Sequence, residues 1–133
     1  MSFLVDTNVL SELVKKRPDP GVLEWARGVK RVALSAVTVD EVYFGLSWKP
    51  NRAVRRWFEE FLATHCEILP VTAGIARRCG EIRGQLKARG QTRSPADMLI
   101  ASTAQEHRLT LVTRNLRDFE ECGVSLVNPF QEG

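Results

Sequence analysis

Short apolar runs alternate in this sequence with longer segments of helical periodicity, and this alternation restricts the possible folds more than any other feature. The five runs of strand length are residues 2–5, 32–35, 68–71, 110–113 and 125–127. A helical segment between successive strands implies crossover connections, which produce a mainly parallel sheet with helices on both faces. The predicted fold class is therefore α/β.

The helical segments are predicted at residues 7–16, 20–28, 36–48, 51–64, 72–89 and 95–107. No repeat or Gly/Ser linker interrupts them. A chain of 133 residues with 44% hydrophobic residues can bury a core without a disulfide or a structural metal. We therefore expect a single domain over residues 1–133.

The three cysteines are widely spaced and lack a C-x-x-C pair, which argues against a disulfide framework and a zinc site. No apolar run approaches the roughly 18 residues of a membrane helix, and the N-terminus does not resemble a secretory signal. These features predict a cytoplasmic protein with no membrane association. The formal net charge of +3, with 14 Arg among 19 basic residues, favours an anionic partner.

Acidic residues recur where the carboxyl ends of the predicted strands would meet. Asp6 follows the first strand, Glu41 lies about one turn into the helix after the second, and Asp118 comes shortly after the fourth. Asp97 opens the helix that leads into the fourth strand. Ligands of open parallel sheets bind at this edge, near the point where the strand order reverses. The four acids are therefore candidate functional residues.

Helix capping is the simpler explanation for each acid taken singly. Asp6 can cap the following helix, and the pairs Ser94/Asp97, Thr38/Glu41 and Asn115/Asp118 have the spacing of a capping box. Capping does not require all four acids at one edge, however, and four close carboxylates repel unless a divalent cation neutralises them. Ligation by oxygen alone favours Mg²⁺ or Mn²⁺.

These residues also carry a resemblance to a known family. The segments are VDTNVLSEL at 5–13, SAVT with Glu41 at 35–41, DMLIASTA at 97–104, LVTRN with Asp118 and Phe119 at 111–119, and VNPF at 127–130. In this order they resemble the PIN-domain ribonucleases, and within them the VapC-type toxins of toxin–antitoxin modules, especially the FitB-like branch. The resemblance covers nearly the whole chain.

The resemblance implies a three-layer α/β/α sandwich around a five-stranded parallel sheet of order 3-2-1-4-5. It maps the family's acidic site onto Asp6, Glu41, Asp97 and Asp118, with Thr113 and Asn115 as possible neighbours. It also implies an RNA substrate, a small cognate antitoxin and a homodimer. Whether Asp118 binds metal directly, through water, or mainly orients Asn115 stays open.

The resulting hypothesis is a metal-dependent endoribonuclease. Asp6 and Asp97 would hold Mg²⁺ or Mn²⁺, and Glu41 and Asp118 would bind a second ion or its waters. Arg89 and Arg93, which approach the site along the chain, are possible RNA contacts that compete with a solvated helix face. Two amphipathic helices rich in Trp and Phe could leave a groove for an antitoxin helix.

Two other functions remain open from the sequence. One is a catalytically silent PIN-like module that binds RNA or a protein. The four acids disfavour this function, because a module that only binds an anionic ligand has no need for clustered carboxylates. The other is a Mg²⁺-dependent phosphohydrolase or DNA nuclease with the same cluster. The phosphohydrolase motif D-x-D-x-T is absent after the first strand, whereas RNA over DNA rests on the resemblance alone.

Overall fold

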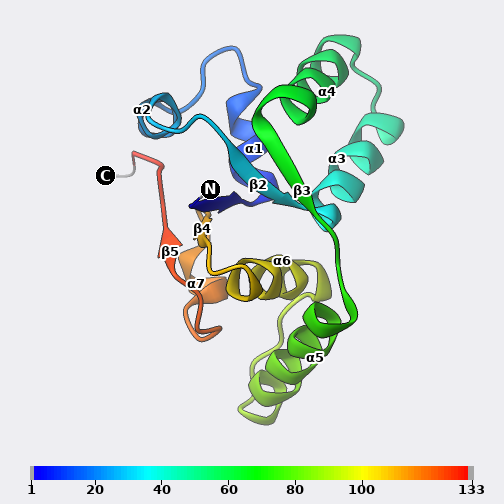
Figure 1. Cartoon of the computed structure of the whole chain (residues 1–133), viewed down its shortest axis with the longest axis vertical. Coiled ribbons are helices and arrows are strands. Elements are labelled where there is room, and N and C mark those ends of the chain that lie inside the picture. Colours follow the sequence, from blue (N-terminus) through cyan, green and yellow to red (C-terminus); the bar gives the residue numbers. More distant parts are fainter. Residues whose placement is uncertain (1, 132–133) are drawn as a thin grey trace.

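The computed structural model describes residues 2–131 as alternating strands and helices (Figure 1). The ends of the predicted domain, residues 1 and 132–133, lie outside the described part. The strands are β1 (Phe3–Val5), β2 (Val32–Ser35), β3 (Cys66–Leu69), β4 (Thr110–Val112) and β5 (Leu126–Val127). The helices are α1 (Thr7–Leu13), α2 (Pro20–Arg27), α3 (Ala36–Trp48), α4 (Arg52–His65), α5 (Ala73–Ala88), α6 (Pro95–Glu106) and α7 (Leu116–Phe119).

All five strands pair in parallel in the order β3-β2-β1-β4-β5. The α/β class and the implied strand order are therefore confirmed. β1 is the central strand, and it pairs on one side with β2 (Leu4 with Ala33) and on the other with β4 (Leu4 with Leu111). The strand order reverses beside β1, so the residues that follow β1 and β4 meet at one edge of the sheet.

Each face of the sheet is covered by its own apolar cluster, which gives the three layers of the sandwich. On one face α1 to α4 pack over residues that include Val5, Leu34 and Phe58. On the other face α5, α6 and α7 pack over residues that include Leu4, Leu111 and Met98. Figure 1 shows these two helical layers above and below the sheet. Successive residues of the buried strands belong alternately to the two clusters, as the pleat of a strand requires.

The third strand lies two residues earlier in the structure than in the prediction. The apolar run predicted a strand at residues 68–71, whereas β3 spans Cys66–Leu69 and follows α4 directly. Pro70 has no backbone N–H and therefore cannot continue the ladder as a donor. The other strands and the six predicted helices lie within a few residues of their predicted bounds, and the single-turn helix α7 was not predicted.

The three cysteines, Cys66, Cys79 and Cys122, are free and buried. Burial raises the pKa of the Cys66 thiol to about 12, so this side chain stays protonated and packs as a small apolar group. Among the described helices, none is both long enough and apolar enough to cross a membrane.

Candidate active site

Asp6 lies where the central strand β1 ends and α1 begins, and only 5% of its surface is exposed. Its backbone N–H donates to the Val112 carbonyl of β4 (3.1 Å), which extends the ladder to the edge of the sheet. Its Oδ1 accepts a hydrogen bond from the Val9 N–H (2.9 Å) and so caps α1. The predicted capping role is confirmed, and it fixes a carboxylate at the centre of the sheet edge.

The surroundings of Asp6 disfavour its charged form. Burial raises the pKa of this carboxyl above 3.8, and the negative charge of Asp97 raises it further. Hydrogen bonds from the Thr113 side chain and from the backbone N–H groups of Val9 and Asn8 lower the pKa, but burial has the larger effect. A cation bound beside Asp6 and Asp97 would offset the unfavourable free energy of the buried, charged carboxylate.

Thr113 and Asn115 follow β4, and Thr113 contacts Asp6. Thr113 is fully buried, hydrogen-bonds to the Asp6 carboxylate and accepts from the Asn115 N–H (3.0 Å) through its Oγ1. Asn115 stands at the N-cap of α7, but its side chain makes no capping hydrogen bond. The interpretation of Asn115 and Asp118 as a capping pair is therefore wrong, and the exposed Asn115 side chain faces the solvent beside the site.

Glu41 lies on α3 and is half-buried. The possible Thr38/Glu41 capping box does not form, because α3 begins earlier and Ser35 caps it by accepting from the Val37 N–H (3.0 Å). The Glu41 Oε1 instead accepts a hydrogen bond from the Thr7 hydroxyl (2.6 Å). Because Thr7 directly follows Asp6, this bond ties Glu41 to the same edge of the sheet.

Asp97 lies in the first turn of α6 and is half-buried. Its backbone N–H donates to the Ser94 Oγ (3.0 Å), so the Ser94 half of the predicted capping box is confirmed. Burial raises the pKa of the Asp97 carboxyl above 3.8, Ser94 lowers it by hydrogen bonding, and the charge of Asp118 raises it. Asp97 therefore interacts electrostatically with an acid on each side.

Three of the four predicted acids thus form a chain of neighbours. The charge of Asp97 raises the pKa of Asp6, and the charge of Asp118 raises the pKa of Asp97. Glu41 joins through Thr7, which sequence reasoning did not select although it immediately follows Asp6 at a strand end. Among residues 2–131, no three His, Cys, Asp or Glu side chains already converge as a ligand group for one ion.

The two predicted RNA contacts differ in their surroundings. Arg93 is half-buried and its Nε donates to the Asp118 carbonyl (3.1 Å), which gives it a role inside the fold. Arg89 is exposed, ends α5 and lies 3.9 Å from the Glu121 carboxylate. Contact of either arginine with RNA stays a prediction.

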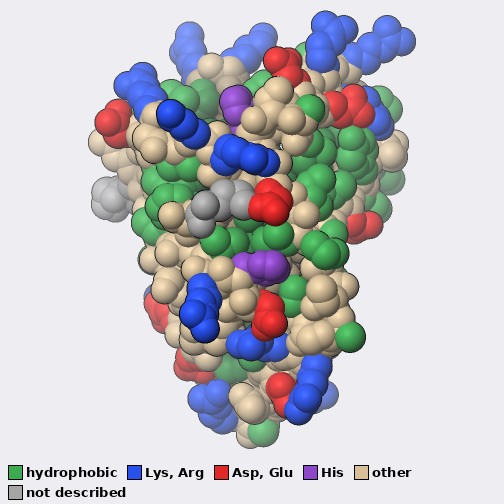
Figure 2. Space-filling model, viewed as in Figure 1, with side chains coloured by type: hydrophobic (Ala, Val, Ile, Leu, Met, Phe, Trp, Pro, Cys, Tyr) green, Lys and Arg blue, Asp and Glu red, His purple; other side chains and the backbone are tan. Residues whose placement is uncertain are grey.

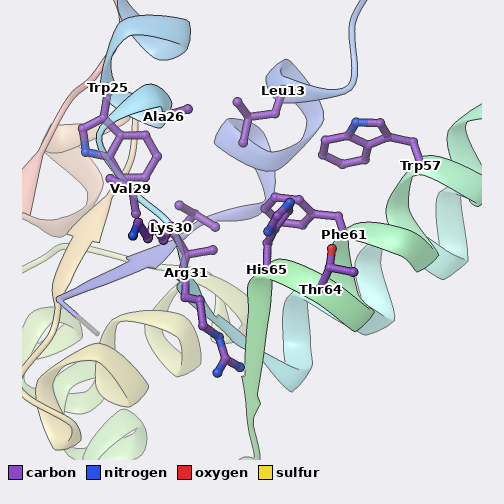
Figure 3. A pocket seen from close by; sticks show the side chains of 12 residues that line it. Leu13, Trp25, Ala26, Val29, Lys30, Arg31, Trp57, Phe61, Thr64 and His65 are labelled. Carbon is purple, nitrogen blue, oxygen red and sulfur yellow. The ribbon is translucent and has the colours of Figure 1, made fainter.

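An apolar groove of about 520 Å³ opens between α2 and α4 (Figure 3). Trp25 of α2 lies on one side, and Trp57 and Phe61 of α4 lie on the other, with the last two rings stacked at 4.9 Å. Lys30 and Arg31 line the groove next to β2. The sequence predicted a groove lined by Trp and Phe side chains. Three of these side chains do line a groove, on the face of the sheet covered by α1 to α4.

The fold and this acidic edge define a class of protein. The chain belongs to the PIN domain family, which matches residues 3–124. Its relatives include the VapC ribonuclease Y4jK of Sinorhizobium fredii, which is 36% identical, with the match covering 97% of this chain and 98% of the relative.

Solved structures agree with this assignment. The crystal structure of FitAcB from Neisseria gonorrhoeae superposes with a TM-score of 0.83 at 32% identity and covers 98% of this chain and 99% of the other. A toxin–antitoxin complex from Klebsiella pneumoniae gives a TM-score of 0.77 at 28% identity and covers 98% and 100% of the two chains. The resemblance found in the sequence is therefore confirmed.

Proposed function

We propose that this chain is a divalent-metal-dependent endoribonuclease that acts as the toxin of a toxin–antitoxin module in the cytoplasm. The observation that carries the proposal is the run of electrostatically coupled acids, Asp6, Asp97 and Asp118, at the carboxyl edge of a parallel sheet. The relative from S. fredii is named a ribonuclease, and one structural neighbour is a toxin–antitoxin complex. The catalytic unit is proposed as a single domain over residues 1–133.

The acids fit a magnesium or manganese ion by their chemistry. Asp6 and Asp97 would hold the ion, because burial and their mutual repulsion disfavour two free charges there. Mg²⁺ commonly uses one or two carboxylates and completes its shell with water and substrate phosphate oxygens, so a preformed group of three side chains is not required. Glu41 and Asp118 would bind a second ion or the water around the first.

The residues around the acids would set up hydrolysis of an RNA phosphodiester. When bound, the ion neutralises charge on the scissile phosphate and lowers the pKa of water. Thr113 holds the Asp6 carboxylate through a hydrogen bond, and Thr7 holds Glu41 at 2.6 Å, so both acids enter the reaction in fixed orientations. Asn115 bonds to Thr113 through its backbone N–H, and its exposed side-chain amide would donate to a phosphate oxygen.

Cleavage of total RNA by the purified protein tests this proposal. We expect cleavage with Mg²⁺, none with EDTA, and none for Asp97→Asn in the presence of Mg²⁺, because the amide cannot supply the anionic ligand. Circular dichroism should show the same fold for the variant, since Ser94 still caps α6 through a backbone N–H.

Equal cleavage in all three reactions would contradict the metal–carboxylate mechanism. RNA binding by the wild type without cleavage under any divalent cation would favour the silent binding module. A matched reaction on single-stranded DNA separates an RNA-specific enzyme from a general nuclease.

The groove between α2 and α4 is the proposed docking site of the antitoxin. Its walls are Trp25, Trp57 and Phe61, and its basic end carries Lys30 and Arg31. An amphipathic helix with apolar residues at a spacing of three and four fits such a groove, and an acidic residue at one end would complement the two cations. The expected partner is the product of a short reading frame adjacent to the gene.

Replacement of one groove residue should weaken inhibition by the antitoxin while RNA cleavage is retained. Phe61→Glu places a charge in the apolar wall, so we expect the affinity for the adjacent-gene product to fall at least about thirtyfold. RNA cleavage should persist, because Phe61 lies outside the acidic edge. Co-expression in a bacterial host and a pull-down measure both effects. Glu60→Ala, at an exposed neighbouring position of α4, is the control. If the adjacent-gene product inhibits the Phe61→Glu variant as efficiently as the wild type, this groove is not its docking site.

The homodimer implied by the family stays a prediction. Phe44 and Trp48 of α3 are 72% and 71% exposed, and Ile68 of the edge strand β3 is 45% exposed. Figure 2 shows hydrophobic side chains on the right of the molecule, where Figure 1 places α3 and α4. A homodimer would bury these three side chains, which a monomer leaves in water.

A further inference from the structure

We propose that Arg93 is a positioning residue that fixes Asp118 relative to Asp97, rather than an arginine that binds RNA. The inference rests on the proposed function, and it assigns to Arg93 a role that its position in the sequence did not indicate. Arg93 immediately precedes Ser94, which caps the helix that carries Asp97. It reaches across to α7, the helix that carries Asp118. One side chain therefore links the segments that hold two of the acids.

The guanidinium of Arg93 makes three hydrogen bonds within the fold. Its Nε donates to the Asp118 carbonyl at 3.1 Å, one terminal nitrogen donates to the Thr92 carbonyl at 3.2 Å, and the other donates to the Gln91 Oε1 at 3.4 Å. These acceptors surround the planar fork of an arginine, whose donors have a fixed geometry. With these bonds made, each of the three guanidinium nitrogens donates to an acceptor within the protein.

The turn that presents Asp118 needs this support. α7 spans only Leu116–Phe119, its N-cap Asn115 supplies no side-chain hydrogen bond, and so short a helix is not stable by itself. The carbonyls in the last turn of a helix have no partner within the helix. Arg93 provides one for Asp118, while the buried Phe119 anchors the same turn to the core.

The loop that carries Arg93 is itself held in place. Gly90 adopts a positive φ of 80° after α5, and the Gln91 N–H returns to the Leu86 carbonyl (2.8 Å), which is a helix-terminating arrangement that favours glycine. The Gln91 amide also donates to Glu121 just beyond α7 (3.3 Å). Arg93 therefore acts from a fixed base, and the spacing of Asp97 and Asp118 depends on it.

Binding of Mn²⁺ and steady-state cleavage of a single-stranded RNA oligonucleotide test the inference together. For Arg93→Ala we expect the Mn²⁺ affinity, measured by calorimetry without RNA, to fall about tenfold and kcat to fall by about ten- to a hundredfold, which is the usual cost of losing a residue that orients metal ligands. KM for RNA and its salt dependence should stay as in the wild type. Arg93→Lys should not restore Mn²⁺ affinity, because an ammonium group cannot reproduce the three bonds of the fork.

A double-mutant cycle with Asp118→Asn keeps the test independent of small changes in stability. If Arg93 acts through Asp118, the variant with both substitutions should cleave no more slowly than Asp118→Asn alone. The matched control is Arg89→Ala, which removes a nearby cation whose side chain contacts Gln85 and Glu121, and it should retain the wild-type affinity for Mn²⁺.

Other outcomes would overturn the inference. A raised KM with unchanged kcat, a salt slope reduced by about 0.7 and rescue by Arg93→Lys would identify a phosphate contact instead. Additive losses in the cycle would exclude action through Asp118. If the wild type neither binds Mn²⁺ nor cleaves RNA, the proposed function itself fails; if it does both and Arg93→Ala matches it, only the role of Arg93 is refuted.

Discussion

An Asp6→Asn variant is expected to melt at a higher temperature than the wild type in metal-free buffer while its RNA cleavage falls by about a thousandfold. The amide can still accept the Val9 N–H and cap α1, and it removes a buried charge that lies close to Asp97. Loss of an anionic metal ligand would remove about 4 kcal/mol of transition-state stabilisation, which corresponds to that factor. Differential scanning fluorimetry and an RNA cleavage assay measure the two effects.

The stability gain should depend on pH in a defined direction. Because the pKa of Asp6 is raised in the folded state, the folded protein binds more protons than the unfolded chain between the unfolded value of 3.8 and the raised value. The free energy of unfolding therefore falls as pH rises through this window, and the cost is complete above it. The difference in Tm between Asp6→Asn and the wild type should shrink on acidification.

Metal and a matched control sharpen this result. Mg²⁺ should raise the Tm of the wild type, because a ligand that binds only the folded state stabilises it. At a concentration of a hundred times Kd, the free energy of unfolding rises by about 2.7 kcal/mol. Mg²⁺ should have little effect on the Tm of Asp6→Asn. Asp40→Asn makes the same change at an exposed position of α3, so neither its Tm nor its cleavage should differ from the wild type. Cleavage by Asp6→Asn at the wild-type rate would contradict the proposed site.

The largest loss of stability is expected for Phe58→Ala. Phe58 is 2% exposed and anchors α4 on the sheet, where it packs with Val5 and Leu34 and meets the Tyr43 ring edge-on at 5.5 Å. Removing a buried phenyl ring costs about 3–5 kcal/mol through lost burial and the cavity left behind. This is a large part of the 5–15 kcal/mol that holds an ordinary domain together.

Urea denaturation gives the comparison. Trp57→Ala, one residue earlier, removes a larger side chain that is only partly buried in the groove and stacks on Phe61. Its expected cost is about 1 kcal/mol. A similar midpoint for the two variants, at equal m-values, would show that Phe58 does not anchor α4 as the packing indicates.

Much of the fold was predictable because hydrophobic periodicity records which face of each element is buried. The run at residues 51–64 predicted an amphipathic helix, and α4 spans Arg52–His65 with Phe58 inward. The position of β3 was not predictable from apolar character, because two apolar residues of the predicted run are exposed: Ile68 on the edge strand β3 and Val71 in the loop after it. α7 was missed since a single turn of helix carries no periodic signal.

The candidate site was predictable residue by residue but not in its supporting contacts. Asp6, Asp97 and Asp118 follow strand ends or open helices, and the topology alone brings such positions together. The bond from Thr7 to Glu41 joins residues far apart in the sequence, and the bond from Arg93 to Asp118 does the same. No local spacing encodes such contacts, so a capping box at Thr38 and Glu41 was the nearest available interpretation and it was wrong.

The central place of β1 has a consequence for how the protein is made. Asp6 is synthesised long before β4, which pairs with β1 and begins at Thr110, and Asp118 follows later still. Synthesis proceeds from the N-terminus, so the acids of a nascent chain stay apart until β4 and α7 have been made. If the chain cuts RNA as proposed, the ribosome that produces it is therefore protected from cleavage by its own nascent product until these two elements have been made.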